Sequence, residues 1–161
     1  MKRIYIIRHA KSSWKHQVND RCRPLKKRGV TDAKLVAEFT STMFNTPDLL
    51  LCSPAKRTQQ TAQLFIPQWH LGKIPFIVEE KLYDFTGQQL IHTIKQCDDT
   101  VNNLMIFAHN FAVTDFVNTF GTVAINSVPT CGFVVIDFKI TSWSLLKKGN
   151  TIYTIFPKNL K

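Results

Sequence analysis

Cysteine is scarce in the 161-residue sequence, and its four cysteines stand far apart. They form no C-x-x-C pair, so neither a zinc site nor a thioredoxin-like redox motif is indicated. We expect no metal and no cofactor, and we expect the thiols to be reduced, with Cys52 and Cys131 in the core. The four are Cys22, Cys52, Cys97 and Cys131.

Long apolar runs are also missing. The apolar run near the N-terminus is short and is interrupted by Arg8, so neither a signal peptide nor a transmembrane span is indicated. A chain of this length can bury a core without disulfide or metal staples. We therefore expect a single domain over residues 1–161, located in the cytoplasm and with no membrane partner.

Acidic residues are outnumbered, with 11 against 21 basic residues and a formal net charge of +10. Such an excess suits nucleic acid, anionic membranes and phosphorylated partners alike. The basic residues are dispersed except for a dense patch over residues 21–28. No helix-turn-helix, zinc finger or aromatic-interleaved RNA motif accompanies the patch, so a nucleic-acid partner is not favoured. A solvated basic rim is the preferred interpretation.

Short apolar stretches alternate with segments of helical periodicity along the chain. This alternation predicts an α/β fold with a central, mostly parallel sheet and helices on both faces. Expected strands are 2–8, 49–52, 76–78, 104–108 and 132–140. The first expected helix starts near 31 and ends before 45, with Leu35, Val36, Phe39 and Met43 recurring at helical spacing. The second has Ser53 as N-cap and Pro54 as first residue and ends at Pro67. The third follows a capping box at 86–89, and the fourth runs from 110 to 121. The tail is expected to form a hairpin over 143–156 that turns at 147–150.

Three of the expected strands end in residues that suit an anion. Arg8 and His9 follow the first, Arg57 lies in the first helical turn after the second, and His109 follows the fourth. Ligands of open α/β sheets collect at this edge, where cations and helix N-terminal amides can hold phosphoryl oxygens. A neutral imidazole is a competent nucleophile toward phosphorus, and Arg8 and Arg57 would disfavour protonation of His9. We expect a phosphate pocket with His9 inside it.

The stretches Arg8-His9-Ala10, residues 53–62 and Phe107-Ala108-His109-Asn110 resemble the histidine phosphatase superfamily, and within it the SixA-like phosphohistidine phosphatases. The resemblance implies a three-layer α/β/α sandwich with a mixed, mostly parallel sheet. It also implies that His9 is phosphorylated and then released by water, while Arg8, Arg57 and His109 hold the phosphate.

The sequence departs from the family pattern at three positions. Ala10 and Ala108 replace glycines that are usual in the family, and Phe111 stands where a proline is common. None of these changes removes a charged residue of the pocket, so we expect activity to be retained.

Two further candidates carry weaker signals. Arg23 could reach the phosphate or could belong to the exposed basic patch. Asp84 is a candidate general acid for the leaving group, although it could equally be a turn residue, and Glu79 and Glu80 are alternatives. The resemblance to SixA-like members implies that a dedicated general acid is absent. Its absence is tolerable for a phosphoramidate substrate, because imidazole leaves phosphorus more readily than an alkoxide does.

These features predict a metal-independent phosphatase that acts through a covalent phosphohistidine on His9, with phosphohistidine in a protein as its substrate. Inorganic phosphate or sulfate is expected to bind the same pocket. Two alternatives stay open. One is a small-molecule phosphomonoesterase, and the other is a non-catalytic module that binds phosphate or nucleic acid, which the charge of +10 would suit.

Overall fold

The structure is a computed structural model that describes residues 1–161. Strands and helices alternate through most of it, as predicted, and short 3-10 turns lie between them. The elements are β1 (Lys2–Arg8), α1 (Lys27–Thr40), β2 (Leu49–Cys52), α2 (Lys56–Gln68), β3 (Phe76–Val78), α3 (Gln88–Lys95), β4 (Asn103–Ala108), α4 (Ala112–Phe120), β5 (Phe133–Phe138) and β6 (Asn150–Ile155).

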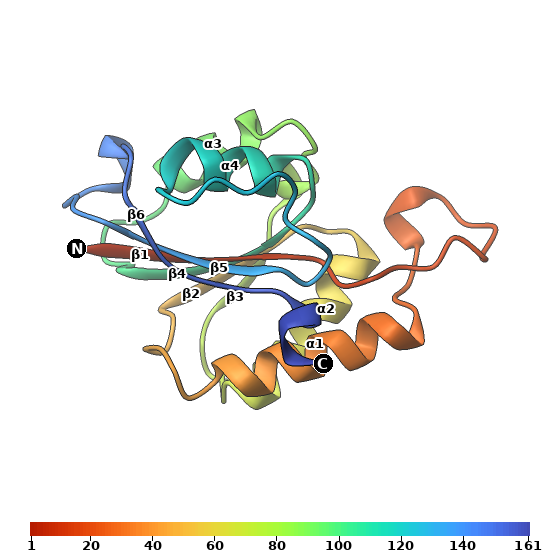
Figure 1. The fold of residues 1–161 in the computed structure, drawn as a ribbon. Coiled ribbons are helices and arrows are strands. Elements are labelled where there is room, and N and C mark those ends of the chain that lie inside the picture. The colour runs from red at the N-terminus through yellow and green to blue at the C-terminus, as the bar shows by residue number, and fades with distance from the viewer.

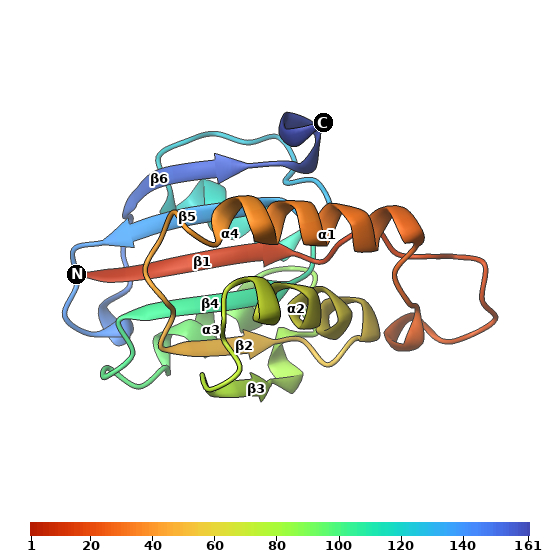
Figure 2. The ribbon, with the colours of Figure 1, turned by 90° about the horizontal axis from the view of Figure 1, so that it is seen from below.

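The six strands form one mixed sheet in the order β3-β2-β4-β1-β5-β6 (Figure 2). The first four of these run parallel, whereas β5 is antiparallel to β1 and β6 is antiparallel to β5. Strand β1 lies between β4 and β5, and Ile4 to Ile7 have no exposed surface. The unbroken apolar run of β1 therefore reflects burial on both faces of the sheet.

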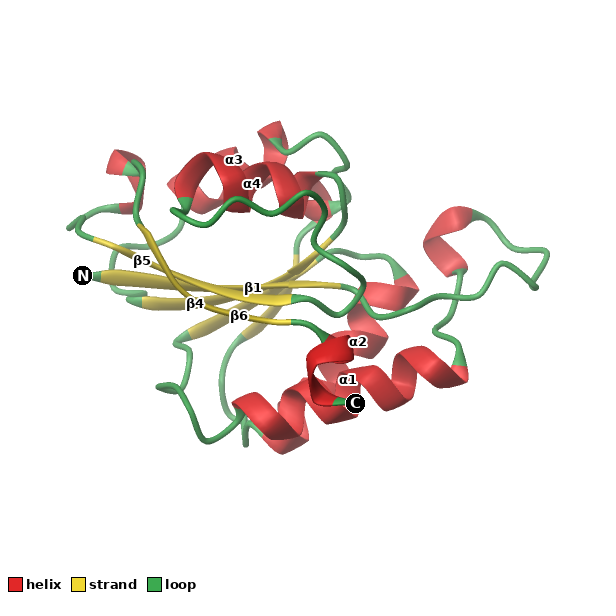
Figure 3. Ribbon diagram, in the orientation of Figure 1, coloured by secondary structure: helices red, strands yellow, loops and turns green.

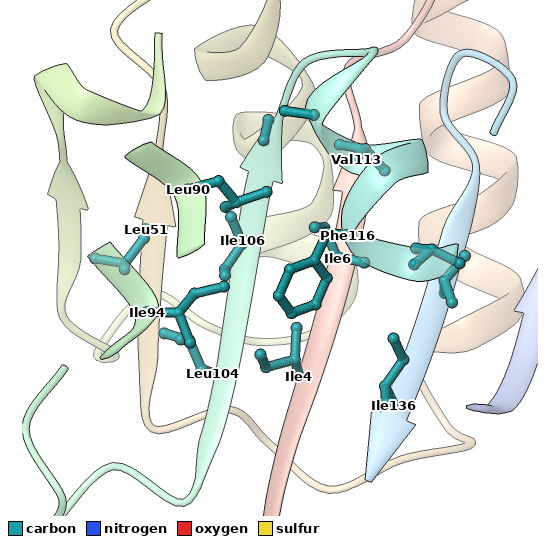
Figure 4. Packing of buried hydrophobic residues seen from close by; sticks show 14 of the residues in the cluster. Ile4, Ile6, Leu51, Leu90, Ile94, Leu104, Ile106, Val113, Phe116 and Ile136 are labelled. Atoms are coloured by element: carbon teal, nitrogen blue, oxygen red, sulfur yellow. The ribbon is translucent and has the colours of Figure 1, made fainter. Parts of the chain in front are cut away.

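Helices cover both faces, with α3 and α4 on one side and α1 and α2 on the other (Figures 1 and 3). Successive side chains of β1 point to opposite faces, so they enter two separate cores. Ile4 and Ile6 pack on the α4 side with Phe116 (Figure 4), while Tyr5 and Ile7 belong to the other core. This arrangement confirms the predicted α/β/α sandwich. None of the helices combines the length and the apolar character needed to cross a membrane.

Helix α1 differs from its prediction at the start and in the face that it buries. It begins at Lys27 instead of near residue 31, and Phe39 and Met43 are 44% and 42% exposed. Its buried face carries small residues, because the helix approaches the loop after β1 very closely. A β-carbon at Gly29 would lie 2.1 Å from the carbonyl oxygen of Lys11. Glycine at this position thus lets α1 hold the loop that follows β1.

The predicted hairpin over 143–156 is wrong. Residues Trp143–Leu145 form a 3-10 turn, and the Trp143 indole is buried and donates to the carbonyl oxygen of Val101 at 2.8 Å. Strand β6 pairs with β5 instead of with a strand of its own tail. Burial of the large Trp143 ring in the α3 and α4 core removes that segment from strand pairing.

Candidate active site

The parallel register brings three strand ends to one place. Arg8 on β1 lies opposite Ala108 on β4, and Cys52 on β2 lies opposite Phe107. The next residues continue this pairing, because His9 N–H donates to Ala108 O at 3.1 Å and Ser53 N–H donates to Phe107 O at 3.1 Å. His9, Ser53 and His109 therefore leave the sheet side by side at its carboxyl edge.

The hydrogen bonds of His9 fix its tautomer. The ring is 7% exposed, and Nδ1–H donates to the carbonyl oxygen of Ala10 at 2.7 Å. A carbonyl oxygen only accepts, so Nδ1 holds the proton and Nε2 holds the lone pair. Burial lowers the pKa of His9 to about 3 despite the hydrogen bond to Ala10, and the positive charges of Arg57 and Arg8 add to the lowering. His9 is a neutral imidazole with a free lone pair on Nε2 near neutral pH.

His109 has no exposed surface, and its ring centroid lies 5.4 Å from that of His9. Arg57 Nη2 approaches Nδ1 at 3.4 Å, and Nε2 lies 2.7 Å from Ser53 Oγ. A guanidinium only donates, so Nδ1 accepts and Nε2–H donates to the serine. Burial lowers the pKa of His109 to about 2, with His9 and Arg57 acting in the same direction. His109 is a second neutral imidazole beside the first.

Ser53 was predicted as the N-cap of the second helix, with Pro54 as its first residue and Pro67 as its end. The structure corrects all three points, since α2 starts at Lys56 with Ala55 as N-cap and includes Pro67 in its last turn. The Ser53 hydroxyl instead accepts from His109 and from Ala55 N–H at 3.2 Å. Its role in orienting His109 was not predicted.

The two expected phosphate-binding arginines lie close to His9 and to each other. Arg57 is 2% exposed, and Arg8 donates through Nη1 to Val128 O at 2.8 Å. The Nε–H groups of both are buried and donate to no protein atom. Burial lowers the pKa of Arg8, and repulsion from Arg57 adds to this. A half-buried and a buried guanidinium with unpaired donors fit a dianion, which would supply acceptors and relieve their repulsion.

Asp20 belongs to the site, although the sequence analysis did not single it out. Arg57 donates from Nη1 to Asp20 O at 2.6 Å and from Nη2 to Oδ2 at 2.9 Å, and Tyr83 donates its hydroxyl proton to Oδ2. Burial alone would raise the pKa of Asp20, but the hydrogen bonds from Tyr83 and Arg57 outweigh it and hold that pKa well below its usual range. Asp20 is therefore a fixed anion that orients Arg57.

Arg23 lies in the wall of the pocket and is only 6% exposed. It donates to Asp20 Oδ1 at 3.1 Å and to Ser12 Oγ at 2.7 Å, and its guanidinium stacks 3.5 Å from the centroid of the Trp14 ring. Of the basic residues at 21–28, Arg21 is paired on the surface with Glu80 at 2.7 Å. Arg23 thus differs from the exposed Arg21. The carboxylate of Glu80, an alternative candidate for the general acid, is paired with Arg21.

Asp84 has a structural role that does not fit a general acid. Its carboxylate accepts the backbone N–H groups of Thr86, Gly87, Gln89 and Leu90 at 3.0–3.1 Å. Burial raises the pKa of Asp84, but these hydrogen bonds outweigh it and the net shift is downward. An ionised carboxylate that is fully used as an acceptor has no proton to donate. The predicted capping box at 86–89 is also wrong, because Asp84 takes its place and Gly87, at φ +109°, is the N-cap.

Replacing Asp84 with alanine is expected to lower the free energy of unfolding by about 2 kcal/mol near neutral pH, because four N–H groups lose their acceptor. The folded pKa lies below the unfolded value of about 3.9, so this stabilisation is complete above the unfolded pKa and is lost as pH falls through the folded pKa. Urea unfolding of wild type and Asp84→Ala should show the stability gap narrow at about pH 3.

The exposed Glu38 on α1 provides the matched control, since Glu38→Ala should change stability by less than about 0.5 kcal/mol at either pH. Unchanged stability of Asp84→Ala together with loss of phosphate-ester hydrolysis would restore Asp84 as the acid.

A loop from the later part of the chain closes the pocket from the other side. Cys131 N–H donates to both Arg8 O and His9 O at 3.0 Å, and Arg8 N–H donates to Gly132 O at 3.1 Å. Because β5 is antiparallel to β1, it is the beginning of β5 that meets the catalytic edge. Residues 128–132 therefore hold the backbone and the side chain of Arg8.

Comparison with solved structures supports this architecture. SixA from Agrobacterium tumefaciens matches with a TM-score of 0.82 and 22% identity, over 97% of this chain and 98% of that chain. A protein histidine phosphatase SixA, complexed with tungstate, matches with a TM-score of 0.80 and 19% identity over 99% of both chains. A phosphoglycerate mutase from Bacillus anthracis matches with a TM-score of 0.64 and 14% identity, over 97% of this chain and 92% of that chain. These likenesses show a shared fold.

Curated relatives are similar over part of their length. An uncharacterised protein of Mycobacterium tuberculosis is 32% identical over 104 residues, which is 64% of this chain and 62% of the relative. An uncharacterised chloroplastic protein of Arabidopsis thaliana is 43% identical over 61 residues, which is 37% of this chain and 28% of the relative. The chain thus spans less than two thirds of the length of these relatives.

The family model of the histidine phosphatase superfamily (branch 1) matches residues 4–112, which is more than half of the chain. The matched range contains Arg8, His9, Arg57 and His109, the four residues that meet at the carboxyl edge of the sheet. The resemblance seen in the sequence is thereby confirmed, and the chain belongs to the histidine phosphatase superfamily, branch 1.

Proposed function

We propose that this chain is a phosphatase that takes the phosphoryl group of phosphohistidine in a protein onto His9 and then releases it to water. One observation carries the proposal. Nε2 of a neutral His9 carries its lone pair at the same sheet edge as the half-buried Arg8 and the buried Arg57, whose Nε–H groups have no protein acceptor. Membership of the superfamily supports a phosphatase activity.

In the first step, Nε2 of His9 attacks phosphorus while the bond from phosphorus to the substrate nitrogen breaks. Arg8 and Arg57 hold the phosphoryl oxygens, whose charge they stabilise as it spreads in transfer. His109 joins them when its Nε2–H turns from Ser53 Oγ to a phosphoryl oxygen. When the other ring nitrogen of the substrate imidazole carries a proton, the leaving group departs as neutral imidazole. In the second step water attacks phosphorus, its proton passes to solvent, and phosphate leaves with the bond to Nε2 broken. His9 returns to its neutral form.

The state of the carboxylates favours a phosphoramidate over a phosphate ester. An alkoxide needs a proton from the protein as it leaves, whereas a ring-protonated imidazole does not. Asp20 is held as an anion by Arg57 and Tyr83, and Asp84 is held as an anion by the N-terminus of α3. Neither group is poised to donate a proton.

Related structures bear on the ligand as well. The SixA structure was obtained with tungstate, a tetrahedral oxyanion, which supports phosphate or sulfate as a ligand of this pocket. A phosphoserine phosphatase from Entamoeba histolytica, in complex with 3-phosphoglyceric acid, has a TM-score of 0.63 and 13% identity to this chain. A small-molecule phosphomonoesterase is therefore the second candidate.

The decisive measurement is a substrate panel in the presence of a metal chelator. We expect a phosphohistidine peptide to be hydrolysed with a kcat/KM at least about 100-fold above that of metabolite phosphate esters, because only the esters need a general acid. A preference for esters would favour the phosphomonoesterase. Tight, salt-sensitive binding of nucleic acid without turnover of any member would favour the non-catalytic module.

A further inference from the structure

Two exposed phenylalanine side chains lie next to His109. Phe85 is 41% exposed and its ring centroid is 5.0 Å from that of His109, while Phe111, two residues after His109, is 56% exposed. Their backbones are joined, because Phe111 N–H donates to Phe85 O at 3.1 Å. Single exposed apolar residues are common on protein surfaces. Phe85 and Phe111 differ from such residues because they lie beside His109.

The rings form a sequence that leads away from the nucleophile. His9 contacts His109 at 5.4 Å between centroids, His109 contacts Phe85 at 5.0 Å, and no ring contact joins His9 to Phe85. His9 and His109 are buried, with 7% and 0% exposure, whereas Phe85 is 41% exposed. In an in-line displacement the leaving group departs on the side of phosphorus opposite to Nε2 of His9. Phe85 lies beyond His109 as seen from His9, and its ring is open to solvent.

The turn that carries Phe85 is held rigidly. Asp84, immediately before it, accepts the backbone N–H groups of Thr86 and Gly87, immediately after it. The Phe85 ring also makes an edge contact with Tyr83, with centroids 5.1 Å apart and planes at 75°. A ring that is already fixed loses little conformational entropy when a second planar group contacts it.

We infer that Phe85, with Phe111 beside it, forms an aromatic subsite that binds a planar, ring-shaped leaving group such as imidazole. Aromatic rings favour offset or edge contacts with other rings, and such contacts give no advantage to a leaving group that lacks a ring. The inference rests on the proposed function, and it assigns to Phe85 the selection of imidazole among the possible leaving groups.

The test compares two substrates that share a phosphorus–nitrogen bond and differ in the ring, phosphoimidazole and phosphoramidate. The readout is the ratio of their kcat/KM values. In Phe85→Leu, which keeps apolar volume but removes the ring, the ratio is expected to fall about tenfold, whereas Phe85→Trp should retain it. Phe39→Leu is the matched control, because Phe39 on α1 is similarly exposed, at 44%.

An unchanged ratio in Phe85→Leu would overturn the subsite, and so would an equal fall in Phe39→Leu. If wild type hydrolyses neither compound, the proposed function fails and the subsite fails with it. If wild type hydrolyses both while Phe85→Leu keeps the wild-type ratio, the subsite alone is wrong.

Discussion

The His9→Ala variant is expected to carry no labelled phosphate when it is mixed with radiolabelled substrate and quenched rapidly without acid, whereas wild type retains label on the protein. Alanine supplies no lone pair, so the phosphoryl group has no acceptor and the two-step route is closed. Turnover should fall by at least about 10⁴-fold, as for other covalent nucleophiles. The quench avoids acid because phosphohistidine is an acid-labile phosphoramidate.

His92 on α3 offers a matched control for this experiment, since it is exposed and lies outside the pocket. His92→Ala should take up label to the wild-type extent. Equal labelling of His9→Ala and wild type would place the phosphoryl group on another residue and would refute the proposed role of Nε2. Circular dichroism on each variant establishes that the fold is intact before labelling is compared.

Arg57→Gln is expected to lower kcat/KM by about 10³-fold, at the upper end of what one preorganised donor contributes. Two effects act together. The substitution removes the buried Arg57 guanidinium, and it leaves the Asp20 carboxylate with Arg23 as its only cationic partner, because the pair with Arg57 at 2.9 Å is lost. The less neutralised Asp20 carboxylate then repels the substrate, so part of the loss in kcat/KM is electrostatic and not due to the missing hydrogen bonds.

That second effect can be isolated with a double variant. Adding Asp20→Asn to Arg57→Gln removes the repelling charge and should restore about tenfold of the lost kcat/KM, although Asp20→Asn alone is expected to be harmful because it loosens Arg57. Arg28→Gln serves as the control, since the Arg28 side chain is 66% exposed and should leave kcat/KM unchanged. A double variant no better than Arg57→Gln would show that Asp20 only orients its neighbours.

The sequence predicted the four pocket residues because their positions depend on local signals. Arg8 ends an apolar strand, and His9 and His109 directly follow one. The carboxyl ends of neighbouring parallel strands meet at the same edge of the sheet, and this does not depend on the length or conformation of the loops. Arg57 is the second residue of the helix after β2, so its position follows from the same rule even though that helix starts two residues later than Ser53-Pro54 suggested.

Asp20 and the partners of Asp84 could not be predicted in this way. Asp20 begins a three-residue 3-10 turn within the long connection after β1, and its position is set by Arg57 and Tyr83, which are 37 and 63 residues away in the chain. Asp84 accepts N–H groups at the start of α3 from outside the helix, across a turn in which Gly87 has a positive φ. A capping box likewise satisfies the first N–H groups of a helix, but it does so with side chains at the N-cap and N3 positions. The start and the buried face of helix α1 were predicted wrongly because Phe39 and Met43 have the helical spacing of buried residues although they are exposed. The face that packs on the sheet consists mainly of small residues.

The antiparallel β5 gives the site an unusual dependence on the order of synthesis. The nucleophile is made within the first ten residues, but the carbonyl that holds the Arg8 side chain and the amide that holds the His9 backbone come from Val128 and Cys131. Closing a loop of this length costs chain entropy. A chain synthesised only as far as β4 lacks Val128 and Cys131, so its Arg8 side chain and its His9 backbone are without the groups that hold them.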